Sequence, residues 1–227
     1  MNHEVIDPWT LAFNEYVKTD SNIEIKHLFF AENPLGLATY FYSYGKGIKR
    51  SAYFDAVYKG LELDCRKTKA AQLTAMQAAG VLIWDIFHHR SKAHCDICKD
   101  IKCGKSIDSN IRTVMIKEGC TLAAFCESLN TLAKRFKFPE KQEDLNIYFM
   151  MPQLTSLPIF NHYNSNPKER LLIDGKDLSD RLRKQNELFI PGNDAIIFPR
   201  HMINVIGGSN TPRPELVKHA GNINLTT

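Results

Sequence analysis

The chain has 227 residues, of which 44% are hydrophobic and 24% are charged, and its net charge is +4. These values are ordinary for a globular protein, and the length fits one large domain or two small ones. The N-terminus MNHEVIDPW lacks the features of a secretory signal, and the longest apolar run, 78–84, is far shorter than the ~20 residues that span a membrane. We therefore expect a cytoplasmic protein and exclude an integral membrane protein.

The first half of the chain contains three predicted elements. Asp7 followed by Pro8 predicts the start of a helix, because an acidic N-cap and a proline in the first turn are typical of helix N-termini. Alternating apolar residues over 23–30 predict a strand. Apolar side chains at helical spacing over 67–88 predict one long helix, whose last turn would present His89.

The second half mixes both kinds of element. We expect strands over 111–117 and 146–151 and an amphipathic helix over 121–136. A charged helix is predicted over 177–189, followed by short apolar segments and an extended tail. Helices and strands interleave irregularly, which predicts an α+β fold with an inserted structural zinc loop. We expect a single domain over 1–227 with a zinc module at about 88–120, and a subdomain boundary could fall near 139–145.

Metal-binding side chains are concentrated in one segment, 84–106. A C-x2-C step with further soft ligands nearby is typical of tetrahedral zinc sites. The best four-ligand set, spaced H-x5-C-x2-C-x4-C, is His89, Cys95, Cys98 and Cys103. His88 or Cys120 could take the place of His89. Four protein ligands leave no open position, so we expect the zinc to be structural.

Positive charge is unevenly distributed along the chain. Residues 45–105 contain twelve Lys or Arg and six Asp or Glu, a net charge of +6, so the remaining residues carry −2. A local positive potential attracts phosphates. The sequence therefore predicts a surface that binds RNA or DNA, with a solvated surface as the alternative.

The segment 44–50, YGKGIKR, is the most specific part of this basic region. Its two glycines allow close backbone approach, and its cations lie beside an aromatic side chain that could stack on a base. The alternative is a glycine turn with solvated lysines. Residues predicted to contact nucleic acid are Tyr44, Lys46, Lys49, Arg50, Arg90 and Lys92.

Common catalytic motifs are missing from the sequence. It contains no G-x-S-x-G elbow, no H-E-x-x-H pair and no dinucleotide-binding fingerprint. We therefore expect a non-catalytic protein. Two alternatives stay open: a metal-dependent nuclease that uses Asp85, His88 and His89, and a zinc-stabilised protein-interaction adaptor.

The length, the CDIC step with Cys103 beyond it and the basic surroundings resemble the small zinc-bearing large-subunit protein of type IV CRISPR effector complexes. The resemblance implies that Cys95, Cys98 and Cys103 bind zinc. It also implies a subunit of a ribonucleoprotein in antiviral defence, in contact with other protein subunits and with guide RNA or target duplex, which it reads without cutting.

Overall fold

A parallel sheet of three strands forms the centre of the protein. The computed structural model describes residues 6–18, 23–34, 36–63, 68–88, 101–141 and 144–150, and separate residues between 155 and 177. The strands are β1 (His27–Ala31), β2 (Val81–Asp85) and β3 (Asn146–Met150), in the spatial order β2-β1-β3. In this register His27 lies opposite Val81 and Asn146.

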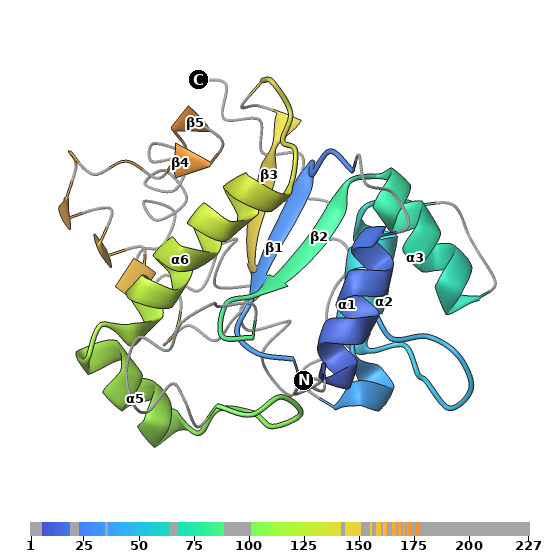
Figure 1. Ribbon diagram of the computed structural model, residues 1–227, viewed down its shortest axis with the longest axis horizontal. Helices are drawn as coiled ribbons and strands as arrows, with labels where there is room; N and C mark the ends of the chain where they lie inside the picture. The colour runs from blue at the N-terminus through green and yellow to red at the C-terminus, as the bar shows by residue number, and fades with distance from the viewer. Residues whose placement is uncertain are drawn as a thin grey trace, which may run out of the picture.

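Helices connect the strands (Figure 1). Helix α1 (Pro8–Lys18) precedes β1. Between β1 and β2 the chain forms the 3-10 helix η1 (Leu37–Thr39), α2 (Ala52–Gly60) and α3 (Lys69–Ala78). Between β2 and β3 it forms α5 (Ser109–Lys117) and α6 (Cys120–Arg135). A short antiparallel pair follows, β4 (Leu172–Ile173) with β5 (Lys176–Asp177).

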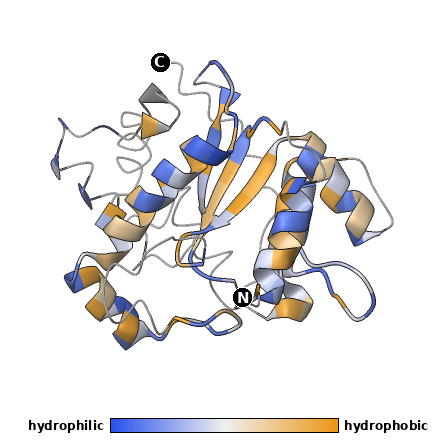
Figure 2. Ribbon diagram, viewed as in Figure 1, coloured by the Kyte–Doolittle hydropathy of each residue, from blue (hydrophilic) through white to orange (hydrophobic). Residues whose placement is uncertain are grey.

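This arrangement is a mixed α/β domain. The predicted mixture of helices and strands is confirmed, but the main sheet is parallel and its strands are joined through helices, which the irregular α+β prediction did not include. Parallel strands are covered on both faces and so read as apolar runs. In Figure 2 most of β2 is accordingly drawn in orange, the hydrophobic end of the scale.

Aromatic side chains join the sheet to the helices. Phe30 of β1 packs against Phe125 of α6, with ring centroids 4.9 Å apart. Trp84 of β2 packs against Phe13 of α1, with centroids 5.9 Å apart. All four side chains are completely buried. These buried contacts anchor α6 and α1 to the sheet.

Three predicted elements are confirmed. Asp7 caps α1, and Pro8 is its first residue. The helix expected over 121–136 is α6, and the strand expected over 146–151 is β3. The strand expected over 23–30 is confirmed in part, because β1 begins at His27.

Two predicted elements are wrong. The helix expected over 67–88 ends at Ala78, because Gly80 adopts a φ of +72° and turns the chain into β2. The run VLIW is thus a buried parallel strand, and the described residues that follow it, 86–88, form a turn rather than the end of a helix. The strand expected over 111–117 is helix α5, whose N-terminus is capped by the side chain of Asp108.

Other predictions lie outside the described residues. These include most of the predicted helix 177–189, of which only Asp177 is described, in β5, and everything that follows it. Among the described residues, no helix is long and apolar enough to cross a membrane.

Candidate metal centre

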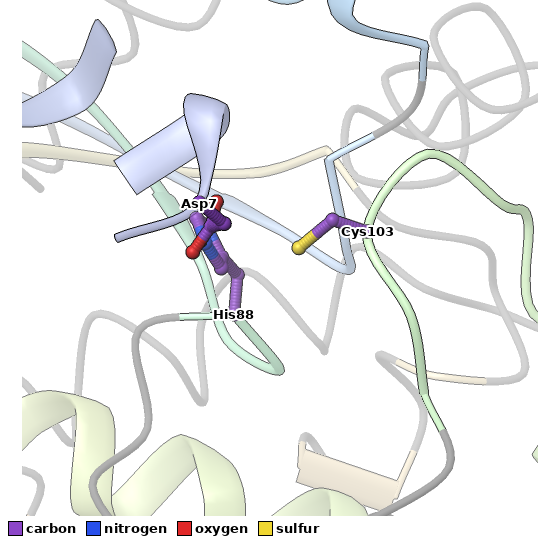
Figure 3. A group of neighbouring side chains, drawn as sticks. All are labelled: Asp7, His88 and Cys103. Atoms are coloured by element: carbon purple, nitrogen blue, oxygen red, sulfur yellow. The ribbon is translucent and has the colours of Figure 1, made fainter. Parts of the chain in front are cut away.

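Three side chains of types that can bind a metal converge near the carboxyl ends of the strands (Figure 3). One side-chain atom from each of Asp7, His88 and Cys103 lies within 4.8 Å of the other two. Asp7 precedes α1, His88 follows β2, and Cys103 lies in the loop before α5. Open parallel sheets place their ligand sites at this edge of the sheet.

The carboxylate of Asp7 is held by the first turn of α1. Its Oδ1 accepts a hydrogen bond from the backbone N–H of Thr10 at 2.9 Å, and its Oδ2 accepts one from the Thr10 hydroxyl at 2.7 Å. Burial alone would raise the pKa of Asp7, but these hydrogen bonds and the imidazole of His88 lower it below its usual value. The carboxylate is therefore ionised and oriented at neutral pH.

The imidazole of His88 lies against this carboxylate. Its Nε2 is 3.4 Å from Asp7 Oδ1, 3.5 Å from Asp7 Oδ2 and 3.0 Å from Thr10 Oγ1. Burial lowers the pKa of His88, and the charge and hydrogen bond of Asp7 oppose this shift. A neutral imidazole beside an ionised carboxylate is the protonation state in which both groups bind metals.

Cys103 approaches from a loop that is fixed to the end of β1. The side-chain amide of Asn33 donates to two backbone carbonyls of the loop 101–105, at 3.1 Å each. Gly104 has a φ of +83°, and a Cβ at this position would lie 3.0 Å from the indole of Trp9. The glycine therefore lets the loop approach α1 closely enough to present the Cys103 sulfur, which is not in a disulfide.

The separation of Asp7 from His88 is compatible with a shared ion as well as with a long hydrogen bond. Most N–H···O hydrogen bonds measure about 2.7–3.2 Å. Tetrahedral zinc, with bonds of about 2.1 Å to nitrogen and oxygen and about 2.3 Å to sulfur, places nitrogen and oxygen about 3.4 Å apart and sulfur about 3.6 Å from either. The 3.4 Å between Nε2 and Oδ1 matches the first value. The sulfur, within 4.8 Å, would move by about 1 Å at most.

A buried carboxyl lies at the same edge of the sheet. Asp85, the last residue of β2, is 3% exposed, and the hydroxyl of Tyr40 donates to its Oδ2 at 3.5 Å. Burial raises the pKa of Asp85 to about 7, and this hydrogen bond opposes the shift. Burial also raises the pKa of Tyr40, with added effects from Asp85 and Cys103. Tyr40 is thus close to both Asp85 and the ligand group.

Glu32, directly after β1, is occupied by protein partners. Arg112 of α5 donates to its two carboxylate oxygens, from Nε at 2.7 Å and from Nη2 at 2.6 Å. The hydroxyl of Thr155 donates to the same carboxylate. This bidentate pair fastens α5 to the sheet edge and leaves Glu32 out of the metal centre.

Of the predicted zinc ligands, Cys103 lies in the described structure and belongs to the three-ligand group. The other three predicted zinc ligands, His89, Cys95 and Cys98, lie outside the described residues, as do Arg90 and Lys92 of the predicted nucleic-acid surface. The predicted four-ligand set as a whole therefore stays a prediction.

The imidazole beside Cys103 is that of His88, which the sequence offered as an alternative to His89. Cys120, the other alternative, is buried at the start of α6, outside the group of Asp7, His88 and Cys103, and its role as a ligand stays a prediction. Asp7 was recognised from the sequence only as a helix cap. Because Asp7 and His88 are far apart in the sequence, no local pattern indicates that their side chains lie together.

The predicted nucleic-acid loop is at the surface. Its exposed residues are Tyr44, Lys46, Lys49 and Arg50. Gly45 and Gly47 have φ values of +113° and +81°. The Tyr44 hydroxyl donates to Glu15, and Arg50 pairs with Asp55 at 3.5 Å. The loop thus presents two lysines on a glycine turn, while its tyrosine and arginine have partners within the protein.

No family model, curated protein or solved structure matches this chain. The resemblance to the CRISPR protein stays a prediction from the sequence, and the function is argued below from the geometry of the site.

Proposed function

We propose that the protein binds one zinc ion through Asp7, His88 and Cys103. The observation that carries this proposal is the convergence of a carboxylate, an imidazole and a thiol, with ligand atoms within 4.8 Å of one another. Two of the three are soft or borderline ligands. Mg²⁺ and Ca²⁺ prefer shells of oxygen, whereas zinc takes sulfur, nitrogen and oxygen together.

The proposed role of the ion is structural, with the fourth position of the tetrahedron filled by a water molecule or by a further ligand. Its ligands come from the N-terminus of α1, the turn after β2 and the loop 101–105, which are far apart in the sequence. An ion shared by these three segments would fasten them at one edge of the sheet. Because the complete ligand group exists only in the folded chain, the free energy of zinc binding would add to the free energy of unfolding.

Zinc titration of protein stripped with a chelator under reducing conditions tests the proposal. We expect one zinc per chain, lost in Cys103→Ser and weakened in His88→Gln. Asp7→Asn should also weaken binding, although asparagine caps a helix as well as aspartate does. Cys126→Ser is the matched control, because Cys126 is a thiol on α6 outside the ligand group. Unchanged zinc affinity in Cys103→Ser would overturn the proposal.

The exposed loop 44–50 supports a second candidate function, the binding of RNA or DNA as a non-catalytic subunit of a larger assembly. The supporting observation is that Lys46 and Lys49 are exposed beside two glycines with positive φ, where a phosphate backbone can approach closely. The affinity should fall with salt, because each phosphate contact releases condensed counterions.

Charge reversal separates a binding loop from a solvated turn. Lys46→Glu with Lys49→Glu should weaken binding to all sequences and reduce the salt dependence. Lys117→Glu with Lys134→Glu changes the net charge equally on the exposed surfaces of α5 and α6, and serves as control. Equal weakening in the two double variants would mean that the loop has no special role.

A further inference from the structure

Thr10 contacts two of the three ligands in the metal centre. Its backbone N–H and its hydroxyl each donate to a different carboxylate oxygen of Asp7, at 2.9 and 2.7 Å. Its Oγ1 also lies 3.0 Å from Nε2 of His88. One residue of the first turn of α1 therefore fixes the carboxylate and the imidazole relative to each other.

The hydrogens of these contacts can be assigned. A hydroxyl has one hydrogen, and Thr10 gives it to Asp7. In the contact with His88 the threonine oxygen is therefore the acceptor and Nε2 is the donor. Each oxygen of the carboxylate has a further lone pair, so Asp7 can accept from Thr10 and bind a metal at the same time.

We propose that Thr10 is a positioning residue that holds Asp7 and His88 at the spacing of metal ligands before the ion arrives, an inference that rests on the proposed zinc site. His88 would bind zinc through Nε2 in the neutral tautomer that carries its hydrogen on Nδ1, and Nε2 would then give up its contact with Thr10. The hydroxyl keeps its bond to Asp7. Outer partners that orient ligands in this way are worth about 10- to 100-fold in metal affinity.

Substitutions at Thr10 separate its side chain from its backbone. Thr10→Val removes the hydroxyl and keeps the shape of the side chain and the backbone N–H. Thr10→Ala also removes the hydroxyl and keeps the backbone N–H, but its side chain is smaller. Thr10→Ser keeps the hydroxyl. Thr74→Val is the matched control, because the hydroxyl of Thr74 donates to a backbone carbonyl within α3, away from the ligand group.

We expect zinc affinity to fall about 10- to 100-fold in Thr10→Val and Thr10→Ala and to stay within about threefold of wild type in Thr10→Ser and Thr74→Val. Cobalt in place of zinc gives a second readout. Its visible absorption bands should shift in Thr10→Val and recover in Thr10→Ser, because they report ligand geometry. A residue that only stabilises α1 would lower the melting temperature in chelator and leave these bands unchanged.

The outcomes distinguish this inference from the proposal on which it rests. If wild type binds no zinc, both are overturned. If wild type binds zinc and both Thr10→Val and Thr10→Ala bind it as tightly or more tightly, the role of Thr10 alone is overturned. Equal weakening in Thr10→Ser would also overturn it, because the hydroxyl would then not be the group that matters.

Discussion

The two ends of the three parallel strands are built in different ways. At the amino ends, main-chain hydrogen bonds join neighbouring segments. The N–H groups of Lys26 and His27 both donate to the carbonyl of Gly80, at 2.9 and 3.0 Å, and the N–H of Asn146 donates to the carbonyl of Lys26 at 2.8 Å. Backbone N–H and C=O groups can pair in this way with any side chains. The amino ends therefore require only that the neighbouring backbone segments approach each other closely.

At the carboxyl ends, side chains from distant segments make the contacts. The proposed ligand group consists of Asp7, His88 and Cys103. The hydroxyl of Tyr40 donates a hydrogen bond to Asp85, and the guanidinium of Arg112 donates to Glu32. Such contacts depend on specific functional groups and can therefore carry chemistry. Changes at the amino ends should alter stability alone, whereas changes at the carboxyl ends should also alter metal binding.

The largest expected effect is at the amino ends. Gly80 has a φ of +72°, and a Cβ there would lie 2.3 Å from the carbonyl oxygen of Glu24. Gly80→Ala should lower the free energy of unfolding by about 3–5 kcal/mol, measured by urea denaturation. Gly47→Ala, with a φ of +81° and nothing within 4 Å, should cost only about 1 kcal/mol. Weakened zinc affinity in the folded fraction of Gly80→Ala would contradict the expectation that changes at the amino ends alter stability alone.

Asp85 at the carboxyl ends should give a stability that depends on pH. Burial raises its pKa from 3.8 to about 7, so the unfolded chain releases this proton first and stability falls as pH rises from about 4 to about 7. Asp85→Asn has no such proton. We compare the free energies of unfolding of Asp85→Asn and wild type in chelator. The difference between the two proteins should shift in favour of the variant by about 2–4 kcal/mol between pH 4 and pH 8. Parallel curves for the two proteins would show that Asp85 is already ionised at pH 5.

His27 at the amino ends should produce the opposite slope. Burial, with a smaller effect from Lys26, lowers the pKa of His27 from 6.5 to about 4, and its Nδ1 lies 3.3 Å from the hydroxyl of Tyr148. The unfolded chain takes up a proton first, so stability falls as pH drops from about 6.5 to about 4, by about 2–3 kcal/mol. His27→Phe should abolish this loss. Because the slopes of His27 and Asp85 oppose each other, each is seen best in the variant that lacks the other.

A smaller effect on stability than that at Gly80 is expected at Gly104, a glycine near the carboxyl ends of the strands. Gly104→Ala would bring a Cβ within 3.0 Å of the Trp9 side chain at a φ of +83°. A side chain can move where a backbone carbonyl cannot, so the cost should be about 1–2 kcal/mol by urea denaturation. Zinc affinity should also fall, because Cys103 precedes this glycine. Unchanged zinc affinity would show that the loop does not set the position of the thiol.

Local signals in the sequence predicted part of this structure. Asp7 with Pro8 marks the start of α1, and the apolar periodicity over 121–136 marks α6, because both depend only on neighbouring residues. β2 was missed because a fully buried parallel strand has no alternation, and its apolar run extended the pattern of α3. The glycine at position 80 was the available signal.

The candidate site was harder to predict from the sequence. The density of cysteine and histidine indicated metal binding and pointed to Cys103, because zinc ligands often cluster along a chain. The contribution of Asp7 depends on where α1 packs, which no local pattern records. Likewise, the β-branched residues of 111–117 predicted a strand. This segment is helical in the structure, where Asp108 caps its N-terminus and it packs beside α6.

X-ray absorption at the zinc edge tests the central claim most directly. The account predicts, for reduced and zinc-loaded protein, a mixed shell with nitrogen or oxygen at about 2.0–2.1 Å and Cys103 as a sulfur ligand at about 2.3 Å. In Cys103→Ser this sulfur contribution should be lost or reduced, and Cys126→Ser should match wild type. A shell of three or four sulfur atoms would contradict the account, because it leaves no room for both Asp7 and His88.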